Sequence, residues 1–106
     1  MHAMFLFDGA PDAKVTILLA HGAGAPMESA ALTRASQALA SVGLRVARFE
    51  FGYMAARRIS AKRPPSPRAE TLKGEYHSAV DALAVKGPLV IGGKSMGGRV
   101  ASMVAD

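Results

Sequence analysis

The sequence contains no cysteine and no tryptophan, and only 6% of its 106 residues are aromatic. Without cysteine, the chain can form no disulfide, no thiolate metal site and no cysteine nucleophile. No apolar run approaches the roughly 20 residues of a membrane-spanning helix, and residues 1–8 lack the basic-then-apolar pattern of a signal peptide. We therefore expect a soluble, cytoplasmic protein that carries no metal or other cofactor and has no membrane partner.

The overall composition is that of a small globular protein. Hydrophobic residues make up 50% of the chain and charged residues 20%, which is typical of an ordinary core and surface. A length of 106 residues is too short for two stacked domains, so we expect residues 1–106 to form a single domain.

Positive charge is concentrated in the middle of the chain. The net charge is +5, and residues 45–73 alone carry eight basic and two acidic residues. This segment could be a solvated loop, or its side chains could form a surface for an anion or an acidic partner. The candidates for such a surface are Arg57, Arg58, Lys62, Arg63 and Arg68. Aromatic residues for base stacking are few and no nucleic-acid motif is present, so we do not expect nucleic acid as a partner.

Apolar runs that end near glycine alternate with segments of helical periodicity. The runs predict strands over 4–7, 15–20, 44–51 and 89–91, and the helical spacing predicts helices over 32–42, 72–83 and from 96 onward. Strands that alternate with helices indicate right-handed crossovers and a sheet with helices on its faces. We therefore expect an α/β fold, a three-layer sandwich with a mostly parallel sheet.

Three local features of this pattern are specific enough to compare with a structure. Gly43 should end the first helix in a left-handed turn, and the buried face of that helix should consist of Leu32, Ala35, Leu39 and Val42. The prolines within 64–67 favour an extended surface loop over 52–69. The apolar run over 89–91 is typical of a strand that is buried in a parallel sheet.

The strand over 89–91 leads into a glycine-rich turn and then into a helix. The turn contains the pattern G-x-S-x-G as Gly93, Lys94, Ser95, Met96 and Gly97. Between a strand and a helix, this pattern is typical of a nucleophilic serine at a strained turn, where glycines remove Cβ atoms that would collide. Ser95 is thus a candidate nucleophile, and the N–H of Met96 at the helix start is a candidate donor to an oxyanion.

A second oxyanion donor is expected from the loop that follows an earlier strand. The residues after the strand over 15–20 are His21, Gly22, Ala23 and Gly24. Glycines in this loop would let the backbone approach a substrate carbonyl group, so the N–H of Ala23 is the candidate second donor. We expect His21 to have a structural role in this loop.

Three other interpretations of the serine turn were weighed. Ser95 could merely cap a helix. Gly93, Lys94 and Ser95 also spell the end of a phosphate-binding loop, but the first glycine of that motif would fall at Pro88. Lys94 could act as the base, but neighbouring side chains in such a turn point in different directions. We prefer the nucleophile because it accounts for both glycine loops.

With these residues the chain resembles the amino-terminal half of an α/β-hydrolase related to dienelactone hydrolases. More narrowly, it is similar to a group of predicted hydrolases that shares its domain with a subunit of the non-specific lethal histone acetyltransferase complex. The matching stretches lie within residues 18–25, 48–58 and 88–101. Gly52 departs from the pattern, because proline is expected there in that group. The resemblance implies a partial α/β-hydrolase fold and an enzyme that cleaves an ester, thioester or similar acyl bond of a small molecule through an acyl-enzyme on Ser95.

The same resemblance implies an acid and then a histidine after the serine. Only Asp106 follows Ser95 as an acid, and all three histidines, His2, His21 and His77, precede it. We therefore expect a truncated chain with little hydrolase activity of its own. Its strand over 89–91 would then form an exposed apolar edge through which the chain self-associates. The alternative is a noncatalytic protein-interaction module of the same fold with a basic loop.

Overall fold

The computed structural model describes residues 4–60 and 65–105. Strands and helices alternate along most of the chain, as predicted. In chain order the elements are β1 (Leu6–Asp8), β2 (Thr16–Ala20), α1 (Ala30–Ser41), β3 (Arg45–Phe49), α2 (Gly52–Ala56), the 3₁₀ helix η1 (Ala69–Leu72), α3 (Lys73–Leu83), β4 (Leu89–Gly93) and α4 (Met96–Ala105).

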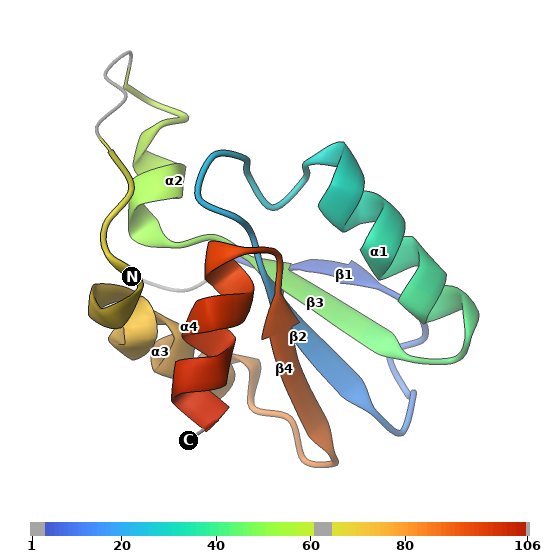
Figure 1. Ribbon diagram of the computed structural model, residues 1–106. Coiled ribbons are helices and arrows are strands. Elements are labelled where there is room, and N and C mark those ends of the chain that lie inside the picture. Colours follow the sequence, from blue (N-terminus) through green and yellow to red (C-terminus); the bar gives the residue numbers. More distant parts are fainter. Residues whose placement is uncertain (1–3, 61–64, 106) are drawn as a thin grey trace.

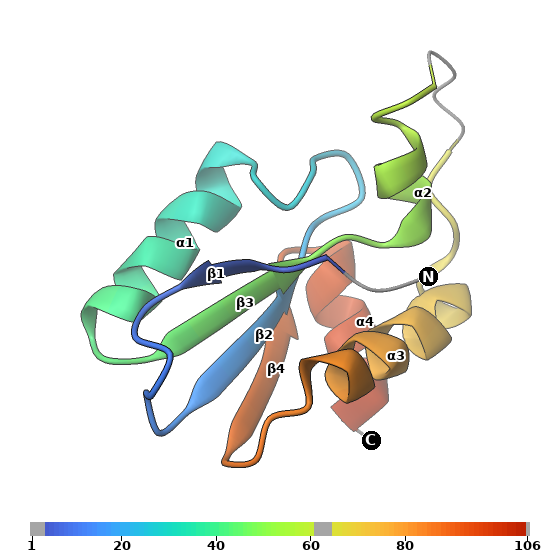
Figure 2. The ribbon, with the colours of Figure 1, turned by 180° about the vertical axis from the view of Figure 1, so that it is seen from behind.

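Within the described residues, four strands form one mixed sheet in the order β1-β3-β2-β4. β2 runs parallel to β3 and to β4, and β1 runs antiparallel to β3. α1 covers one face of this sheet, and α3 and α4 cover the other (Figures 1 and 2). The predicted three-layer α/β fold with a mostly parallel sheet is therefore confirmed.

The register of the sheet brings the carboxyl ends of the parallel strands to one edge. Ala20 at the end of β2 lies opposite Phe49 of β3 and Gly93 of β4. The segments that follow these three strands therefore start at the same edge, which is at the top of Figure 1. In open α/β sheets, ligands bind outside the carboxyl ends of the strands.

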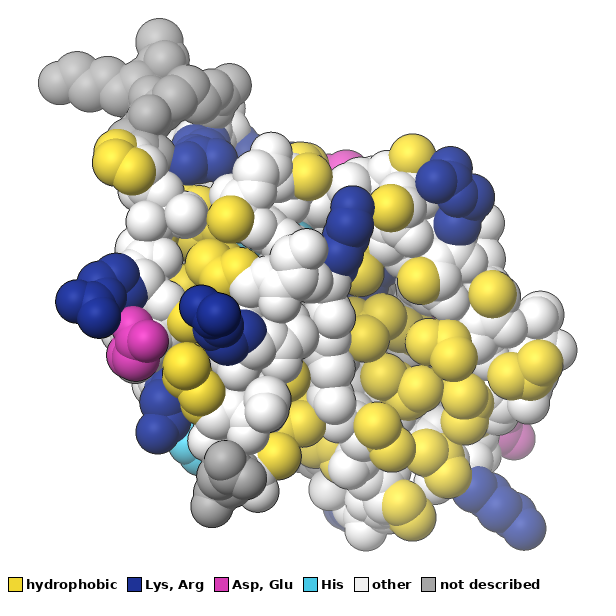
Figure 3. Space-filling model, viewed as in Figure 1, with side chains coloured by type: hydrophobic (Ala, Val, Ile, Leu, Met, Phe, Trp, Pro, Cys, Tyr) yellow, Lys and Arg dark blue, Asp and Glu magenta, His cyan; other side chains and the backbone are white. Residues whose placement is uncertain are grey.

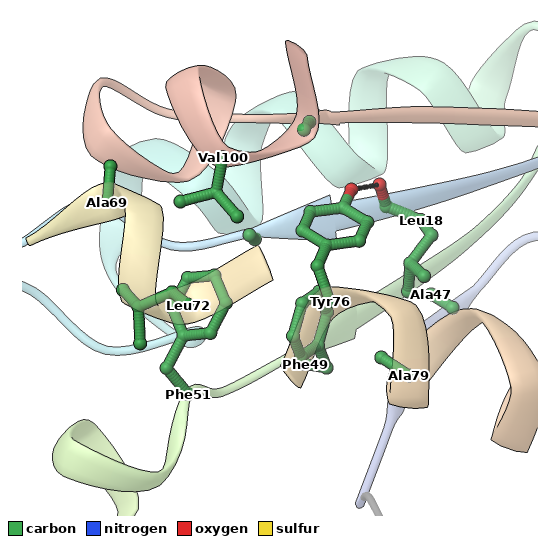
Figure 4. Close-up of a cluster of buried hydrophobic side chains, with 11 residues drawn as sticks. Leu18, Ala47, Phe49, Phe51, Ala69, Leu72, Tyr76, Ala79 and Val100 are labelled. Carbon is green, nitrogen blue, oxygen red and sulfur yellow. Dashed lines mark hydrogen bonds between the residues drawn. The ribbon is translucent and has the colours of Figure 1, made fainter. Parts of the chain in front are cut away.

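Each face of the sheet has its own hydrophobic core. Successive side chains of β2 point to opposite faces, so this strand contributes to both cores. On the α1 face the buried members are Ile17, Leu19, Leu32 and Val46. On the other face a larger cluster joins the sheet to α3 and α4 (Figure 4), with Leu18, Ala20, Ala47, Phe49, Phe51, Ala69, Leu72, Tyr76, Ala79, Val100 and Ala101 buried. Burial of these side chains provides the main force that holds the helices on the sheet.

Tyr76 of α3 also ties β2 to β4 through its buried hydroxyl group. The ring packs edge-on against Phe49, with the centroids 4.9 Å apart. The hydroxyl oxygen lies 2.6 Å from the carbonyl oxygen of Leu18 and accepts a 3.0 Å hydrogen bond from the N–H of Gly92. Burial raises the pKa of this phenol, which therefore stays protonated and donates to Leu18, as Figure 4 shows. The contact holds the end of β4 in place just before the serine turn.

The buried face of α1 differs from the predicted one. Ala35 is exposed, and Val42 follows the helix with 73% of its surface exposed. Ser36 is buried instead, and its hydroxyl donates a 2.6 Å hydrogen bond to Asp8 of β1. The same carboxylate forms a 3.0 Å ion pair with the buried Arg48 of β3. Helical periodicity selects apolar residues, so it did not predict that Ser36 is buried. A serine on the helix and an arginine on the neighbouring strand tolerate burial only when a partner such as Asp8 lies beside them.

The segment over 52–69 is not wholly extended, contrary to the prediction. α2 occupies its first residues and η1 begins at its last one. Pro65 and Pro67 lie in irregular backbone as expected, and Pro64 lies outside the described residues. The prolines therefore exclude helix only near their own positions. Gly43 has a φ of +94°, which confirms the predicted left-handed turn after α1.

β4 lies at an edge of the sheet and not inside it. Among the described strands it pairs only with β2, and Val90 is 50% exposed. The predicted exposed edge is therefore present among the described strands, whereas the interpretation of 89–91 as a buried strand is wrong, because none of its three residues is buried. Figure 3 shows hydrophobic side chains gathered beside β4 and α1 on this side of the molecule. Self-association through this edge stays a prediction.

Candidate active site

Ser95 lies at the exposed tip of the turn between β4 and α4. β4 ends at Gly93 and α4 begins at Met96, so only Lys94 and Ser95 separate the strand from the helix. The side chain of Ser95 is exposed, and its φ is +51°, in the left-handed region that residues with a Cβ rarely adopt. This conformation costs roughly 1–2 kcal/mol for an L-residue. Strain of this kind is found most often at functional sites.

Gly93 and Gly97, two residues on either side of Ser95, have no room for a side chain. A Cβ on Gly93 would lie 2.5 Å from the carbonyl carbon of Gly97 and 2.7 Å from the carbonyl oxygen of Ala20. A Cβ on Gly97 would lie 2.6 Å from the same oxygen and closer still to the carbonyl oxygen of His21. The close approach that the sequence predicts for these two glycines is therefore present.

The loop that follows β2 packs directly against the serine turn. The N–H of Lys94 donates a 3.1 Å hydrogen bond to Ala20 at the end of β2. A Cβ on Gly22 would lie 3.4 Å from the carbonyl oxygen of Lys94 and 3.8 Å from the Cβ of Ser95. Gly24 differs, because nothing lies within 4 Å of the position that its Cβ would take. The two glycine loops are thus neighbours, although sterics do not require glycine at Gly24.

A cavity of about 440 Å³ opens at this turn. Ser95, Met96 and Ala23 all line it, so the structure brings together the three residues to which the sequence analysis gave a catalytic role. Met96 is the first residue of α4, so its N–H has no partner within the helix. The remaining lining residues belong to the segment before α3 and to α4, and they are Ser66, Pro67, Arg68, Ala69 and Arg99.

Comparison with known families gives an independent view of this arrangement. The family model of an alpha/beta hydrolase domain matches residues 13–106. The chain belongs to the alpha/beta hydrolase family. No curated protein and no solved structure matches this chain. The narrower resemblance of this alpha/beta hydrolase to dienelactone hydrolases and to the histone acetyltransferase subunit stays a prediction.

The cavity of this alpha/beta hydrolase is lined in part by side chains that can donate hydrogen bonds. The residues that line the cavity carry two hydroxyl groups and two guanidinium groups. Over the described residues, no cluster of three or more His, Cys, Asp or Glu side chains is arranged to hold a metal ion. None of the helices described is long and apolar enough to cross a membrane.

His21 supports the site by joining the glycine loop to the residue that precedes α2. It is only 1% exposed, and its Nε2 accepts a 3.1 Å hydrogen bond from the N–H of Phe51, the residue that precedes α2. Its Nδ1 lies 2.6 Å from the carbonyl oxygen of Gly22. The neutral ring with its proton on Nδ1 satisfies both contacts. The expected structural role of His21 therefore has a geometric basis in a link between the glycine loop and α2.

The burial of His21 predicts that the protein loses stability in mild acid. Burial lowers the pKa of His21 below its ordinary value of 6.5, and the charges of Arg57 and Arg58 act in the same direction. The His21 ring takes up a proton near pH 6.5 in the unfolded chain but only at a lower pH in the folded chain. The contribution of neutral His21 to the free energy of unfolding is therefore complete above pH 6.5. It is lost as the pH falls toward the lowered pKa, by about 1.4 kcal/mol for each unit of the shift. Urea unfolding at pH 7.5 and pH 5 measures the loss.

Two histidine variants make this test specific. His21→Gln should flatten the pH dependence of the unfolding free energy, because the titrating ring is gone. His77→Gln should keep it, since His77 is exposed on α3. An equal loss of stability between pH 7.5 and pH 5 in the wild type and in His21→Gln would show that other groups cause it.

Tyr53 is a supporting residue that lies in a stretch carrying the family resemblance but to which the sequence analysis gave no role. Its hydroxyl donates a 3.0 Å hydrogen bond to the carbonyl oxygen of Ala23, and its ring centroid lies 5.8 Å from that of His21. Burial raises the pKa of Tyr53, which keeps its hydroxyl protonated as a donor. Because Tyr53 belongs to α2, this short helix holds the loop that carries the candidate second oxyanion donor. The sequence signals were the family resemblance over 48–58 and the position of an aromatic residue shortly after a strand that ends at the same sheet edge.

The predicted basic surface is only partly available to an anion. Arg58 forms ion pairs with Glu28 and Glu50, which balance its charge. The guanidinium group of Arg57 lies over the ring of Tyr53, 5.1 Å from its centroid. Lys62 and Arg63 lie outside the described residues. Arg58 is thus not the free cation that the sequence analysis expected, because Glu50, 8 residues earlier, and Glu28, 30 residues earlier, both reach it.

Proposed function

We propose that the protein is a serine hydrolase that cleaves an ester, thioester or similar acyl bond of a small molecule. The observation that carries this proposal is the conformation of Ser95, which is exposed with a φ of +51° between two glycines that leave no room for a Cβ. A serine that caps a helix has an extended backbone, so capping does not account for this turn. Membership of the alpha/beta hydrolase family supports the same reaction class.

The proposed reaction forms and then hydrolyses an acyl-enzyme. The Oγ of Ser95 attacks the acyl carbon, and its proton passes to a general base. The electron pair of the carbonyl group moves onto oxygen, where the N–H groups of Met96 and Ala23 and the positive end of α4 would stabilise it. The electron pair then re-forms the carbonyl group, the C–O or C–S bond to the leaving group breaks, and the base gives its proton to the leaving alcohol or thiol, so that the acyl group stays on Ser95. Water then attacks in the same way and releases the acid.

The general base of this proposal comes from outside the described residues. A serine hydroxyl is a weak nucleophile unless a base accepts its proton. His21 is unsuitable, because it is buried and its Nε2 already accepts a hydrogen bond from Phe51. His77 is exposed on α3 and does not line the cavity. We therefore propose that a histidine and an acid from another segment complete the triad.

Labelling with a fluorophosphonate tests the proposal, because this probe reacts with serines whose hydroxyl is activated. In the full-length gene product we expect one modified peptide, identified by mass spectrometry after digestion, that carries the label on Ser95. The exposed Ser78 of α3 and Ser102 of α4 are internal controls and should stay unmodified. A folded protein that takes up no label at Ser95 would contradict the proposal and would favour the noncatalytic module.

A further inference from the structure

The cavity at Ser95 carries positive charge without a balancing acid in its wall. Two of its lining residues, Arg68 and Arg99, are arginines, and none of the aspartates or glutamates in the described part of the chain lines it. Figure 3 shows Lys and Arg side chains around this part of α4. A concave site lined by charges of one sign concentrates ligands of the opposite sign.

Arg99 is the better placed of the two arginines. It lies four residues after Ser95 on α4, and its N–H donates a 3.0 Å hydrogen bond to the carbonyl oxygen of Ser95. Ser95 itself precedes the helix, and both residues line the same cavity, so Arg99 lies in the first turn of α4 next to the serine turn. The side chain of Arg99 is exposed, and none of the ion pairs among the described residues involves it. Its guanidinium group is therefore available to a ligand at Ser95.

Arg68 also lines the cavity but binds a ligand less specifically. It forms a 3.4 Å ion pair with Glu70, and both side chains are largely exposed, at 87% and 56%. An exposed pair of this kind contributes between about 0 and 1 kcal/mol, so a bound anion can compete with it. Arg68 therefore adds positive potential, whereas Arg99 has a backbone that is hydrogen-bonded to that of the nucleophile.

We infer that the cavity takes an acyl substrate that carries an anionic oxygen group, a carboxylate or a phosphate, and that Arg99 binds this group. The inference rests on the proposed hydrolase function and adds the substrate class to it. A guanidinium group donates two parallel hydrogen bonds to a carboxylate or a phosphate, which a lysine cannot do. Since Arg99 and Ser95 line the same cavity and their backbones are joined by a hydrogen bond, we expect a short carbon chain between the anionic group and the acyl carbon of the substrate. Arg99 is then a specificity-determining residue of this enzyme.

Three matched fluorophosphonate probes test the inference on the full-length gene product. Their alkyl chains have the same length and end in a carboxylate, a phosphonate or a methyl group. We expect an anionic probe to label Ser95 roughly 10- to 100-fold faster than the methyl probe, the range that charge-assisted hydrogen bonds provide. Which anionic probe reacts faster distinguishes a carboxylate from a phosphate substrate.

Variants of Arg99 identify the residue responsible. Arg99→Gln should bring the ratio of anionic to methyl labelling rates close to one, and Arg99→Lys should give an intermediate ratio. Arg34→Gln, which removes an exposed cation on α1, should keep the full ratio. Because each ratio is measured within one variant, a change in the folded fraction cancels.

The outcomes separate this inference from the function on which it rests. If none of the probes labels Ser95, the serine hydrolase proposal fails, and the inference fails with it. If all three probes label Ser95 at the same rate, or if Arg99→Gln keeps the wild-type ratio, the hydrolase stands and the anionic substrate class is wrong.

Discussion

Replacing Ser95 with glycine is expected to abolish fluorophosphonate labelling and hydrolysis while leaving the protein at least as stable as the wild type. The rate should fall by more than about a thousandfold, because the attacking oxygen is gone. Glycine adopts a φ of +51° without steric strain. After the greater freedom of glycine in the unfolded chain is subtracted, the gain in unfolding free energy should be up to about 1 kcal/mol. Labelling rates and urea unfolding measure the two effects separately.

Ala84 provides a matched control for this substitution. It has the same φ of +51° as Ser95, but it lies at the end of α3 and does not line the cavity. Ala84→Gly should raise the stability by a similar amount and keep the labelling rate of the wild type. A Ser95→Gly protein that loses stability would show that the serine holds the turn together, and the strained serine would then be structural.

Replacing Gly97 with alanine is expected to lower the free energy of unfolding by about 3–5 kcal/mol, which places it among the most damaging point substitutions. The new methyl group would lie 2.6 Å from the carbonyl oxygen of Ala20 and closer still to that of His21. Both are backbone atoms of β2 and its loop, so they cannot rotate away as a flexible side chain would. α4 would have to move away from the sheet. Its buried residues Val100 and Ala101 would then lose their packing in the core.

The same change at Gly74 separates this collision from the general effect of glycine in a helix. Gly74 lies in α3 with nothing within 4 Å of the position of an added Cβ. Gly74→Ala should therefore stabilise the protein, by roughly 0.5–1 kcal/mol, because alanine favours the helix. Urea unfolding of both variants gives the comparison. If Gly97→Ala were as stable as the wild type, the tight contact between the serine turn and β2 would not exist in solution.

The order of strands and helices was predictable because apolar runs and helical spacing are local properties of the chain. The serine turn was predictable for the same reason. Gly93 and Gly97 approach each other only because the backbone reverses at Ser95, and the residues that allow this reversal are neighbours in sequence. Gly43 likewise ends its helix in a left-handed turn, as its position after an apolar helix indicates.

Burial and support around the site were not predictable from local patterns. The short helix α2 was missed because nearby prolines suggested an extended loop. Tyr53 and His21 reach Ala23 and Phe51 across 30 residues of sequence. Arg48 is buried because Asp8, 40 residues earlier in the chain, lies beside it. Each of these contacts depends on which strands become neighbours in the sheet.

The sequence by itself determined that a serine would stand on a tight, glycine-flanked turn between a strand and a helix, since only local backbone sterics are involved. The tertiary structure decided which groups surround that serine. Pairing of β2 with β4 placed the loop of Ala23 against the turn, and packing of η1 and α4 placed two arginines around the cavity. Contacts between distant segments depend on sheet register and on the packing of both cores, and these arise only when the whole chain has folded.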